Sequence, residues 1–285
     1  MIDPRTLLAW PFPPVEQRYD ARDSTIYALG IGLGADPLDP GQLRFVTVEA
    51  DDLLAFPTMA VVLARGPSFS ADPRSGIDHR MVLHGEQGIE FLRPLPATGR
   101  VRSRSRITDV VDKGAGKGAL IYAETILSGE DGDDIARCRS STFARADGGF
   151  GGNPASPFPP HPIPDRAPDL MCDLPTFRNA ALLYRLNGDL NPLHSDPQAA
   201  RFAGFERPIL HGLCSYGVAA HAVLRSVCDY DPARLHRLDV RFSAPVFPGE
   251  EISVQIWRDG PAISFRAFVR ARGAKVIDNG FALTS

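Results

Sequence analysis

A weak internal repeat is the feature that most constrains how this chain can fold. Val82-Leu-His-Gly85 in the first half returns as Ile209-Leu-His-Gly212 in the second. Each copy leads to a proline, after 8 residues (86–93) in the first half and after 32 residues (213–244) in the second. A long helix and its connection to the next strand do not fit into the shorter spacer. The repeat therefore predicts two copies of one fold, with a long helix only in the second.

A segment rich in glycine and proline separates the two copies. Residues 148–168 read GGFGGNPASPFPPHPIPDRAP, a composition typical of an extended linker. The full length of 285 residues also suits two domains of roughly 140 each. We predict an N-terminal domain over 1–147, the linker over 148–168 and a C-terminal domain over 169–285. By itself, the C-terminal domain is expected to expose the sheet face that meets its twin.

Polar and apolar residues alternate in long runs in both halves, which predicts antiparallel strands with one solvated face. The arginine-rich face near 100–106 is interpreted as such a solvated surface. Helices are expected over Asp23–Leu29 and over Leu213–Val227. The fold class is therefore α+β. The predicted strands cover 100–114, 117–129, 133–147, 234–246, 250–258, 262–272 and 275–283.

Composition excludes several classes of protein. The chain is 44% hydrophobic and 23% charged, and it lacks an apolar run of about 18 residues that could span a bilayer. A net charge of −3 provides no general basic field for nucleic acid. The N-terminus lacks the pattern of a secretory signal, and the C-terminal Ala-Leu-Thr-Ser is not a Ser-Lys-Leu address. We therefore expect no membrane or nucleic-acid partner and a cytoplasmic location.

The four cysteines (Cys138, Cys172, Cys214 and Cys228) are scattered without CxxC pairs. This spacing indicates reduced thiols rather than a zinc site or a disulfide framework. We expect neither a metal nor a redox cofactor.

One short stretch combines a carboxylate, a carboxamide and an imidazole. Asp189, Asn191 and His194 lie within six residues, next to Gly188 and Pro192, which disfavour a helix. These side chains are therefore expected on a loop, between a helix over 179–186 and a second over 196–203 that Ser195 caps and Gly204 ends. Groups this close could share one water molecule as an acid/base pair. The alternative is ordinary turn chemistry, for which Asp and Asn are common.

The same stretch resembles a known family. Tyr184-Arg-Leu-Asn-Gly-Asp-Leu-Asn-Pro-Leu-His194, followed by Ile209-Leu-His-Gly-Leu-Cys214, is similar to the signature of the (R)-specific 2-enoyl-CoA hydratases. These are the hydratase 2 or MaoC-like dehydratases, which have hotdog folds, and the layout resembles the hydratase region of peroxisomal multifunctional enzyme type 2. The resemblance implies a tandem hotdog. Its N-terminal copy would lack the central helix and leave room for an acyl chain, and its C-terminal copy would be complete and catalytic.

The resemblance also implies roles for single residues. Asp189 and His194 would divide the activation of water and the protonation of the α-carbon, with Asp189 favoured as the base. Asn191 would help to hold that water or to orient the pair. The N–H of Gly212, at the start of a helix, would stabilise charge on the thioester oxygen; the alternative is that Gly212 only permits a tight turn. His211 is interpreted as structural. The residues that match substrate contacts of the family are His84, Gly85, Lys113 and Phe242.

The predicted function is reversible hydration of trans-2-enoyl-CoA to (R)-3-hydroxyacyl-CoA. One alternative is a dehydratase for acyl-carrier-protein or specialised acyl thioesters. Another, of a different class, is a non-catalytic module that binds acyl-CoA. The expected partner is the acyl-CoA substrate, and a homodimer is possible.

Overall fold

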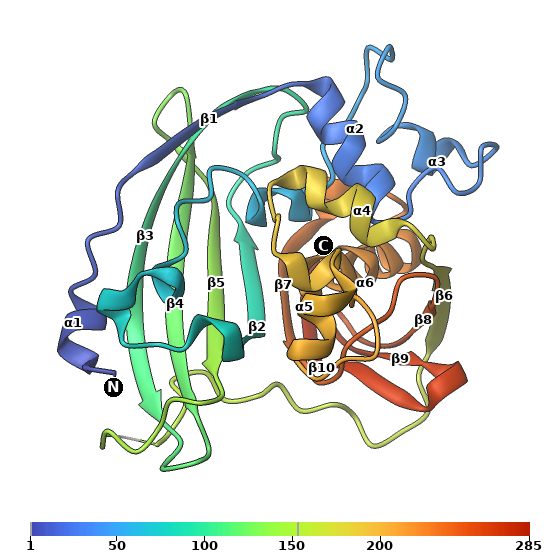
Figure 1. Ribbon diagram of the computed structural model, residues 1–285. Coiled ribbons are helices and arrows are strands. Elements are labelled where there is room, and N and C mark those ends of the chain that lie inside the picture. Colours follow the sequence, from blue (N-terminus) through green and yellow to red (C-terminus); the bar gives the residue numbers. More distant parts are fainter. Residues whose placement is uncertain (1, 153) are drawn as a thin grey trace.

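The computed structural model describes residues 2–152 and 154–285. Its strands form one continuous antiparallel sheet in the order β1-β3-β4-β5-β2-β7-β10-β9-β8-β6 (Figure 1). The first half contributes β1 (Val15–Tyr19), β2 (Val82–Phe91), β3 (Gly99–Asp112), β4 (Ala119–Gly129) and β5 (Asp134–Ala144). The second half contributes β6 (Leu170–Pro175), β7 (Leu235–Phe242), β8 (Glu251–Asp259), β9 (Ala262–Val269) and β10 (Ala274–Thr284). The α-helices are α1 (Pro4–Leu8), α2 (Ala21–Gly30), α3 (Pro40–Leu43), α4 (Ala180–Tyr184), α5 (Pro197–Phe202) and α6 (Gly212–Val227).

The long helix α6 lies inside the curled strands of the second half (Figure 1). It is apolar almost all round, with Tyr216 and Leu224 fully buried, as expected of a helix enclosed in a core. In the first half, the residues after Gly85 continue β2 instead. The longest helix there among the described residues is α2, which packs against α4 rather than across its own sheet. The predicted tandem hotdog, with a central helix only in the C-terminal half, is confirmed.

The two halves join edge to edge through β2 and β7. Ile89 pairs with Leu238, and both side chains are in the core. On the other face, Arg241 forms an ion pair with Glu86 at 2.9 Å. The expectation that the halves meet through sheet faces is therefore wrong. The backbone hydrogen bonds of the sheet run straight across the seam, because both edge strands are long enough to pair.

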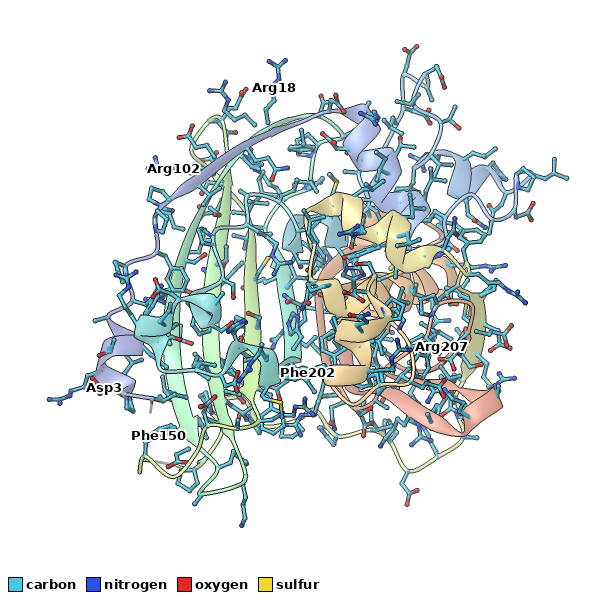
Figure 2. All side chains as sticks on the ribbon, viewed as in Figure 1. Asp3, Arg18, Arg102, Phe150, Phe202 and Arg207 are labelled. Atoms are coloured by element: carbon cyan, nitrogen blue, oxygen red, sulfur yellow. The ribbon has the colours of Figure 1, made fainter. Side chains whose placement is uncertain are left out.

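The sequence-based prediction missed three strands and misplaced one cap. The strands β1 and β6 are short and form the two edges of the sheet, and β2 contains two glycines that weaken its pattern. The cap of α5 is Asp196, whose carboxylate accepts a hydrogen bond from the Gln198 N–H at 2.7 Å. Ser195 lies one residue too early for this role. The arginines of the first sheet face solvent as predicted, as Arg18 and Arg102 show (Figure 2).

Residues that follow α2 leave the first sheet and cover α6. Phe45 and Phe56 are fully buried there, with ring centroids 6.4 Å from Tyr230 and His221 respectively. One hydrophobic core therefore contains residues of both halves. The first sheet has a smaller apolar cluster of its own, in which Ile107 and Ile121 of the sheet belong with Leu7 of α1 and with Ile77. The proposed domain boundaries, and the acyl groove expected on this sheet, stay predictions.

The described residues of the linker form neither helix nor strand, and they run from the first half to the second along the lower side of the molecule in the view of Figure 1. Tyr122 of β4 hydrogen-bonds Ser156 at 2.7 Å, and His161 hydrogen-bonds Ser264 of β9 at 2.8 Å. The linker is thus attached to both halves. A cavity of about 480 Å³ lies between it and strands β2 and β7.

Candidate active site

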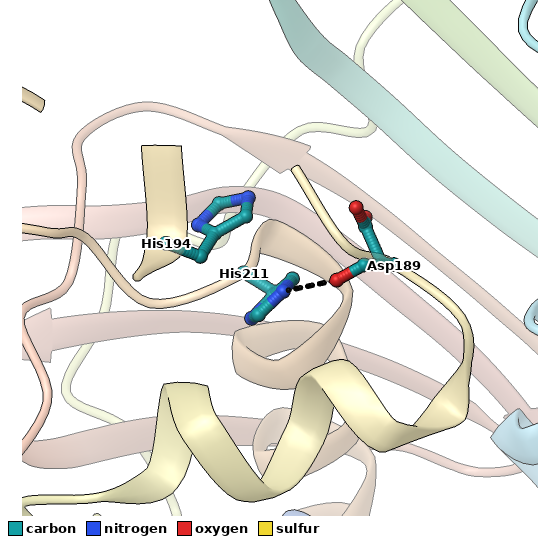
Figure 3. Close-up of side chains that lie close together, drawn as sticks. All are labelled: Asp189, His194 and His211. Atoms are coloured by element: carbon teal, nitrogen blue, oxygen red, sulfur yellow. Dashed lines mark hydrogen bonds between the residues drawn. The ribbon is translucent and has the colours of Figure 1, made fainter. Parts of the chain in front are cut away.

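The loop after α4 presents Asp189 (Figure 3). α4 ends in a 3-10 turn over Arg185–Asn187, and Gly188 follows with φ of 99°, a left-handed conformation that favours glycine. This turn brings a carboxylate oxygen of Asp189 within 4.8 Å of a ring nitrogen of His194 and of His211. One carboxylate oxygen, Oδ1, accepts a weak hydrogen bond from the Asn191 N–H at 3.3 Å.

Asn191 shapes the next turn. Its side-chain oxygen accepts a hydrogen bond from the Leu193 N–H at 3.0 Å and so caps the 3-10 turn Pro192–His194. This contact orients the segment that carries His194. The carboxamide oxygen is therefore already engaged, which favours an orienting role for Asn191 over direct contact with water.

His194 is buried, and its Nδ1 lies 2.9 Å from the carbonyl oxygen of Ile209. A carbonyl accepts only, so Nδ1 carries the proton and Nε2 keeps its lone pair. Burial lowers the pKa of His194, which is neutral at pH 7. The imidazole therefore offers an acceptor at Nε2, and no described residue occupies this atom with a hydrogen bond.

His211 lies beneath His194 and belongs to the same cluster (Figure 3). The two rings stack with centroids 3.7 Å apart. Nε2 of His211 donates to the backbone carbonyl of Asp189 at 3.1 Å, while Nδ1 is buried without a partner among the described residues. Burial lowers the pKa of His211 to about 4. His211, which directly precedes Gly212, thus ties the Asp189 loop to the start of α6. This contact suits a structural imidazole, and the role of His211 stays a prediction.

Gly212 is the first residue of α6. Among the described residues, none accepts a hydrogen bond from its N–H, as expected for the first turn of a helix. Its φ is not in the left-handed region, and a Cβ added there would lie 3.6 Å from the ring of Phe242, an ordinary contact. Neither the backbone conformation nor the packing therefore requires glycine at this position.

His84 and Phe242 face each other across the seam between the halves. The ring centroids are 5.1 Å apart, and His84 Nε2 lies 3.0 Å from the Glu86 carbonyl. Burial, assisted by the positive charge of Arg65, lowers the pKa of His84 to about 4. Through Phe242, this predicted substrate contact is linked to Gly212.

Gly85 and Lys113 are placed differently from His84. A Cβ on Gly85 would lie 2.7 Å from Ser141 Oγ, so close packing inside the sheet accounts for this glycine. Lys113 is exposed in the turn between β3 and β4, and no described contact links it to Asp189 or His194. Their substrate roles stay predictions.

Arg65 of the first half also reaches the site, which the sequence-based prediction missed. Its Nη1 lies 3.6 Å from Asp189 Oδ2. Burial would raise the pKa of the Asp189 carboxyl, but neighbouring positive charge, that of Arg65 first, lowers it. The only signal in the sequence was an arginine at the end of the apolar run Met59–Ala64.

Donor atoms of Asp189, His194 and His211 lie within 4.8 Å of one another, a spacing that a metal ion could use. The charge beside the carboxylate argues against this use, because the Arg65 guanidinium lies 3.6 Å from Asp189 Oδ2. The hydrogen bonds do not decide it, because His194 and His211 each donate one N–H to a backbone carbonyl, as ligating histidines also do. The site is better suited to a neutral or anionic ligand than to a cation, and the expected absence of a metal stays a prediction.

Both halves of the chain match known domain families. Residues 17–146 match the MFE-2 hydratase 2 N-terminal domain, and residues 161–279 match the MaoC-like domain. None of the helices in the described part of the chain is long and apolar enough to cross a membrane.

Similar proteins cover the chain almost completely. Enoyl-CoA hydratase ChsH3 of Mycobacterium tuberculosis is 38% identical, over 99% of this chain and 98% of that protein. The crystal structure of a MaoC-like dehydratase from Phytophthora capsici matches with a TM-score of 0.86 at 35% identity, over 99% of this chain and 98% of that one. The structure of full-length peroxisomal multifunctional enzyme type 2 from Drosophila melanogaster matches with a TM-score of 0.82 at 35% identity, over 95% of this chain and 48% of that one. The chain therefore belongs to the hydratase 2 family, in which an MFE-2 hydratase 2 N-terminal domain is followed by a MaoC-like domain.

Proposed function

We propose that this protein is an enoyl-CoA hydratase that adds water reversibly to trans-2-enoyl-CoA and forms (R)-3-hydroxyacyl-CoA. The observation that carries this proposal is the pairing of two acceptors at one point, the Asp189 carboxylate and the free Nε2 of neutral His194, next to the start of α6. A relative 38% identical over almost the whole chain is named enoyl-CoA hydratase.

In the proposed reaction, one water molecule donates its hydrogens to Asp189 and His194. An O–H bond breaks as the water oxygen forms a bond to C3, and the electron pair of the double bond moves toward the thioester oxygen. The proton taken by the pair then reaches C2, so that one water is added and the pair returns to its first protonation state. By resemblance to the family, Asp189 is favoured as the base and His194 as its partner. Both groups are in their proton-accepting forms at pH 7, because nearby positive charge lowers the pKa of Asp189 and burial lowers the pKa of His194.

The thioester oxygen gains negative charge during this step. The N–H groups at the start of α6 carry partial positive charge and would stabilise it. The fold tolerates a Cβ at Gly212, which would make an ordinary contact with the ring of Phe242, so close approach of a substrate is the reason that we propose for glycine at this position. The glycine is thus better explained by a ligand than by the turn.

Turnover of crotonyl-CoA by the purified protein, followed by ultraviolet absorbance, tests the activity, and chiral analysis of the product tests its (R) configuration. Asp189→Asn and His194→Gln should each lower the hydration rate by a factor on the order of 10² or more. Asp51→Asn, at an exposed position of the first half, is the control and should match the wild type.

Unchanged thermal unfolding of the two site variants would show that the fold is intact. Near-normal turnover in either of them would contradict the assignment. No turnover in the wild type, together with tight binding of acyl-CoA, would favour the non-catalytic module. The choice of coenzyme A over acyl carrier protein is tested by supplying the same acyl group on both carriers. The homodimer and the cytoplasmic location stay predictions.

A further inference from the structure

Arg65 follows a residue with an unusual backbone conformation. Ala64, which precedes it, has φ of 49°, a left-handed conformation that is unfavourable for alanine. Two side chains of the first half fix this conformation. Gln17 of β1 accepts a hydrogen bond from the Ala64 N–H at 2.6 Å, and Ser103 of β3 donates one to its carbonyl at 2.6 Å. Non-glycine residues in such conformations often occur at functional sites.

The result of this backbone conformation is that Arg65 crosses to the second half. Its guanidinium lies 3.6 Å from Asp189 Oδ2, while Oδ1 faces the Asn191 N–H. The side chains are 48% and 28% exposed respectively, and ion pairs this exposed stabilise a fold little. Stability alone therefore does not account for an unfavourable backbone conformation at Ala64.

Among the described residues, three imidazoles also lie around Asp189. His194 and His211 face it from the second half and His84 from the first. Burial lowers the pKa of all three, so they are neutral at pH 7 and do not supply positive charge there. Arg185 is a further cation of the site, but it acts on His211. Arg65 is thus the cation that faces the carboxylate directly.

We propose that Arg65 is a positioning residue of the hydratase reaction, which the first half uses to keep the Asp189 carboxylate ionised and oriented toward the substrate. This inference rests on the proposed function. It gives the first half a part in catalysis besides any binding of the acyl chain. It also explains why Gln17 and Ser103 hold Ala64 in its conformation.

The test is the pH profile of kcat/KM for crotonyl-CoA with Arg65→Gln. Loss of the cation raises the pKa of Asp189, so the carboxylate takes up its proton at a higher pH and hydration begins to fall at a higher pH. The rate at pH 5 relative to pH 8 should drop by a factor on the order of 3 to 10 against the wild type. Arg65→Lys keeps the charge and should restore most of the rate at pH 5.

Control variants separate the loss of the contact between Arg65 and Asp189 from other consequences of removing an arginine. Arg44→Gln removes an equally exposed arginine, which pairs with Asp52 at 3.5 Å in the same half, and should leave the profile unchanged. Ser103→Ala removes the hydrogen bond to the Ala64 carbonyl. It should shift the pH profile in the same direction as Arg65→Gln, but by a smaller amount. In an Asp189→Asn background, Arg65→Gln should have no further effect on the pH profile. In a His84→Phe background, the shift should persist.

The inference has two clear ways to fail. If Arg65→Gln raises KM for crotonyl-CoA without changing kcat or the pH profile, and has no effect on crotonyl-pantetheine, Arg65 binds the phosphates of coenzyme A instead. If the profile of Arg65→Gln matches that of Arg44→Gln, the contact is incidental. Both results leave the proposed function intact, whereas absence of turnover in the wild type would remove the proposed function first.

Discussion

The two Leu-His-Gly copies show how the halves of this molecule diverged. In the second half, His211 and Gly212 open the enclosed helix α6, and no described residue accepts a hydrogen bond from the Gly212 N–H. In the first half, His84 and Gly85 lie in strand β2, where the glycine packs against Ser141. The same tripeptide thus starts a helix in one place and continues a strand in the other. The residues that follow it decide between these outcomes.

A second pair of similar segments, Tyr27-Ala-Leu-Gly30 and Tyr184-Arg-Leu-Asn-Gly188, leads to the same lesson. Tyr27 of α2 and Tyr184 of α4 are both fully buried, with ring centroids 5.9 Å apart. After Tyr184 the chain turns at Gly188 and presents Asp189. After Tyr27 it enters the segment that covers α6 and later reaches Arg65. One half kept the acid/base pair, and the other supplies residues that surround it.

Separating the halves should have the largest effect. The C-terminal half alone (169–285) keeps Asp189, His194 and Gly212, but it exposes the edge of β7 and the surface of α6 that Phe45 and Phe56 cover. It should be insoluble or self-associated and should not hydrate crotonyl-CoA. Size-exclusion chromatography and turnover measure this, and co-expression with residues 1–168 should restore both. A soluble, active monomer of the C-terminal half would contradict this prediction, because it would show that this half does not need the first half for folding or catalysis.

The two glycines offer a sharper comparison. Gly212→Ala should leave the free energy of unfolding nearly unchanged, because the added Cβ would make only an ordinary contact with Phe242. It should lower hydration by a factor of roughly 10 to 10², because the methyl group would occupy the position that we propose for the thioester. Gly85→Ala should do the opposite, with unfolding easier by about 1 kcal/mol and kcat largely kept. Denaturant unfolding and turnover of both variants test this.

A further variant tests why Gly85→Ala should lose stability. In Gly85→Ala with Ser141→Ala, the close contact with the hydroxyl is gone, and stability should return. A large loss of kcat in Gly85→Ala at normal stability would instead support a substrate role for the first Leu-His-Gly copy.

Lengthening the acyl chain of the substrate by one methylene should have the smallest effect on kcat/KM. If the first half holds the acyl chain, where no helix crosses its sheet, each buried methylene should contribute about 0.8 kcal/mol. Values of kcat/KM should then rise over several carbons beyond crotonyl-CoA and level off at the end of the groove. A flat or falling series would mean that the first half supports the fold and the site without holding the chain.

Local features of the sequence determined a large part of this protein. Gly188 and Pro192 excluded a helix around Asp189, and the unequal spacers after Gly85 and Gly212 placed the long helix in one half only. Alternating runs gave seven strands of the sheet. Each of these inferences depends on residues close together in the chain, whose effect on the backbone is largely independent of context.

The tertiary structure alone decided which distant residues meet. Arg65 and Asp189 face each other because β2 pairs with β7 and because Gln17 and Ser103 fix Ala64. No local pattern marks Arg65, since its partner lies in the other half of the chain. The stacking of His211 on His194 depends in the same way on where α6 begins relative to the loop after α4. Contacts of this kind come from the packing of whole elements, and a short sequence pattern does not encode that packing.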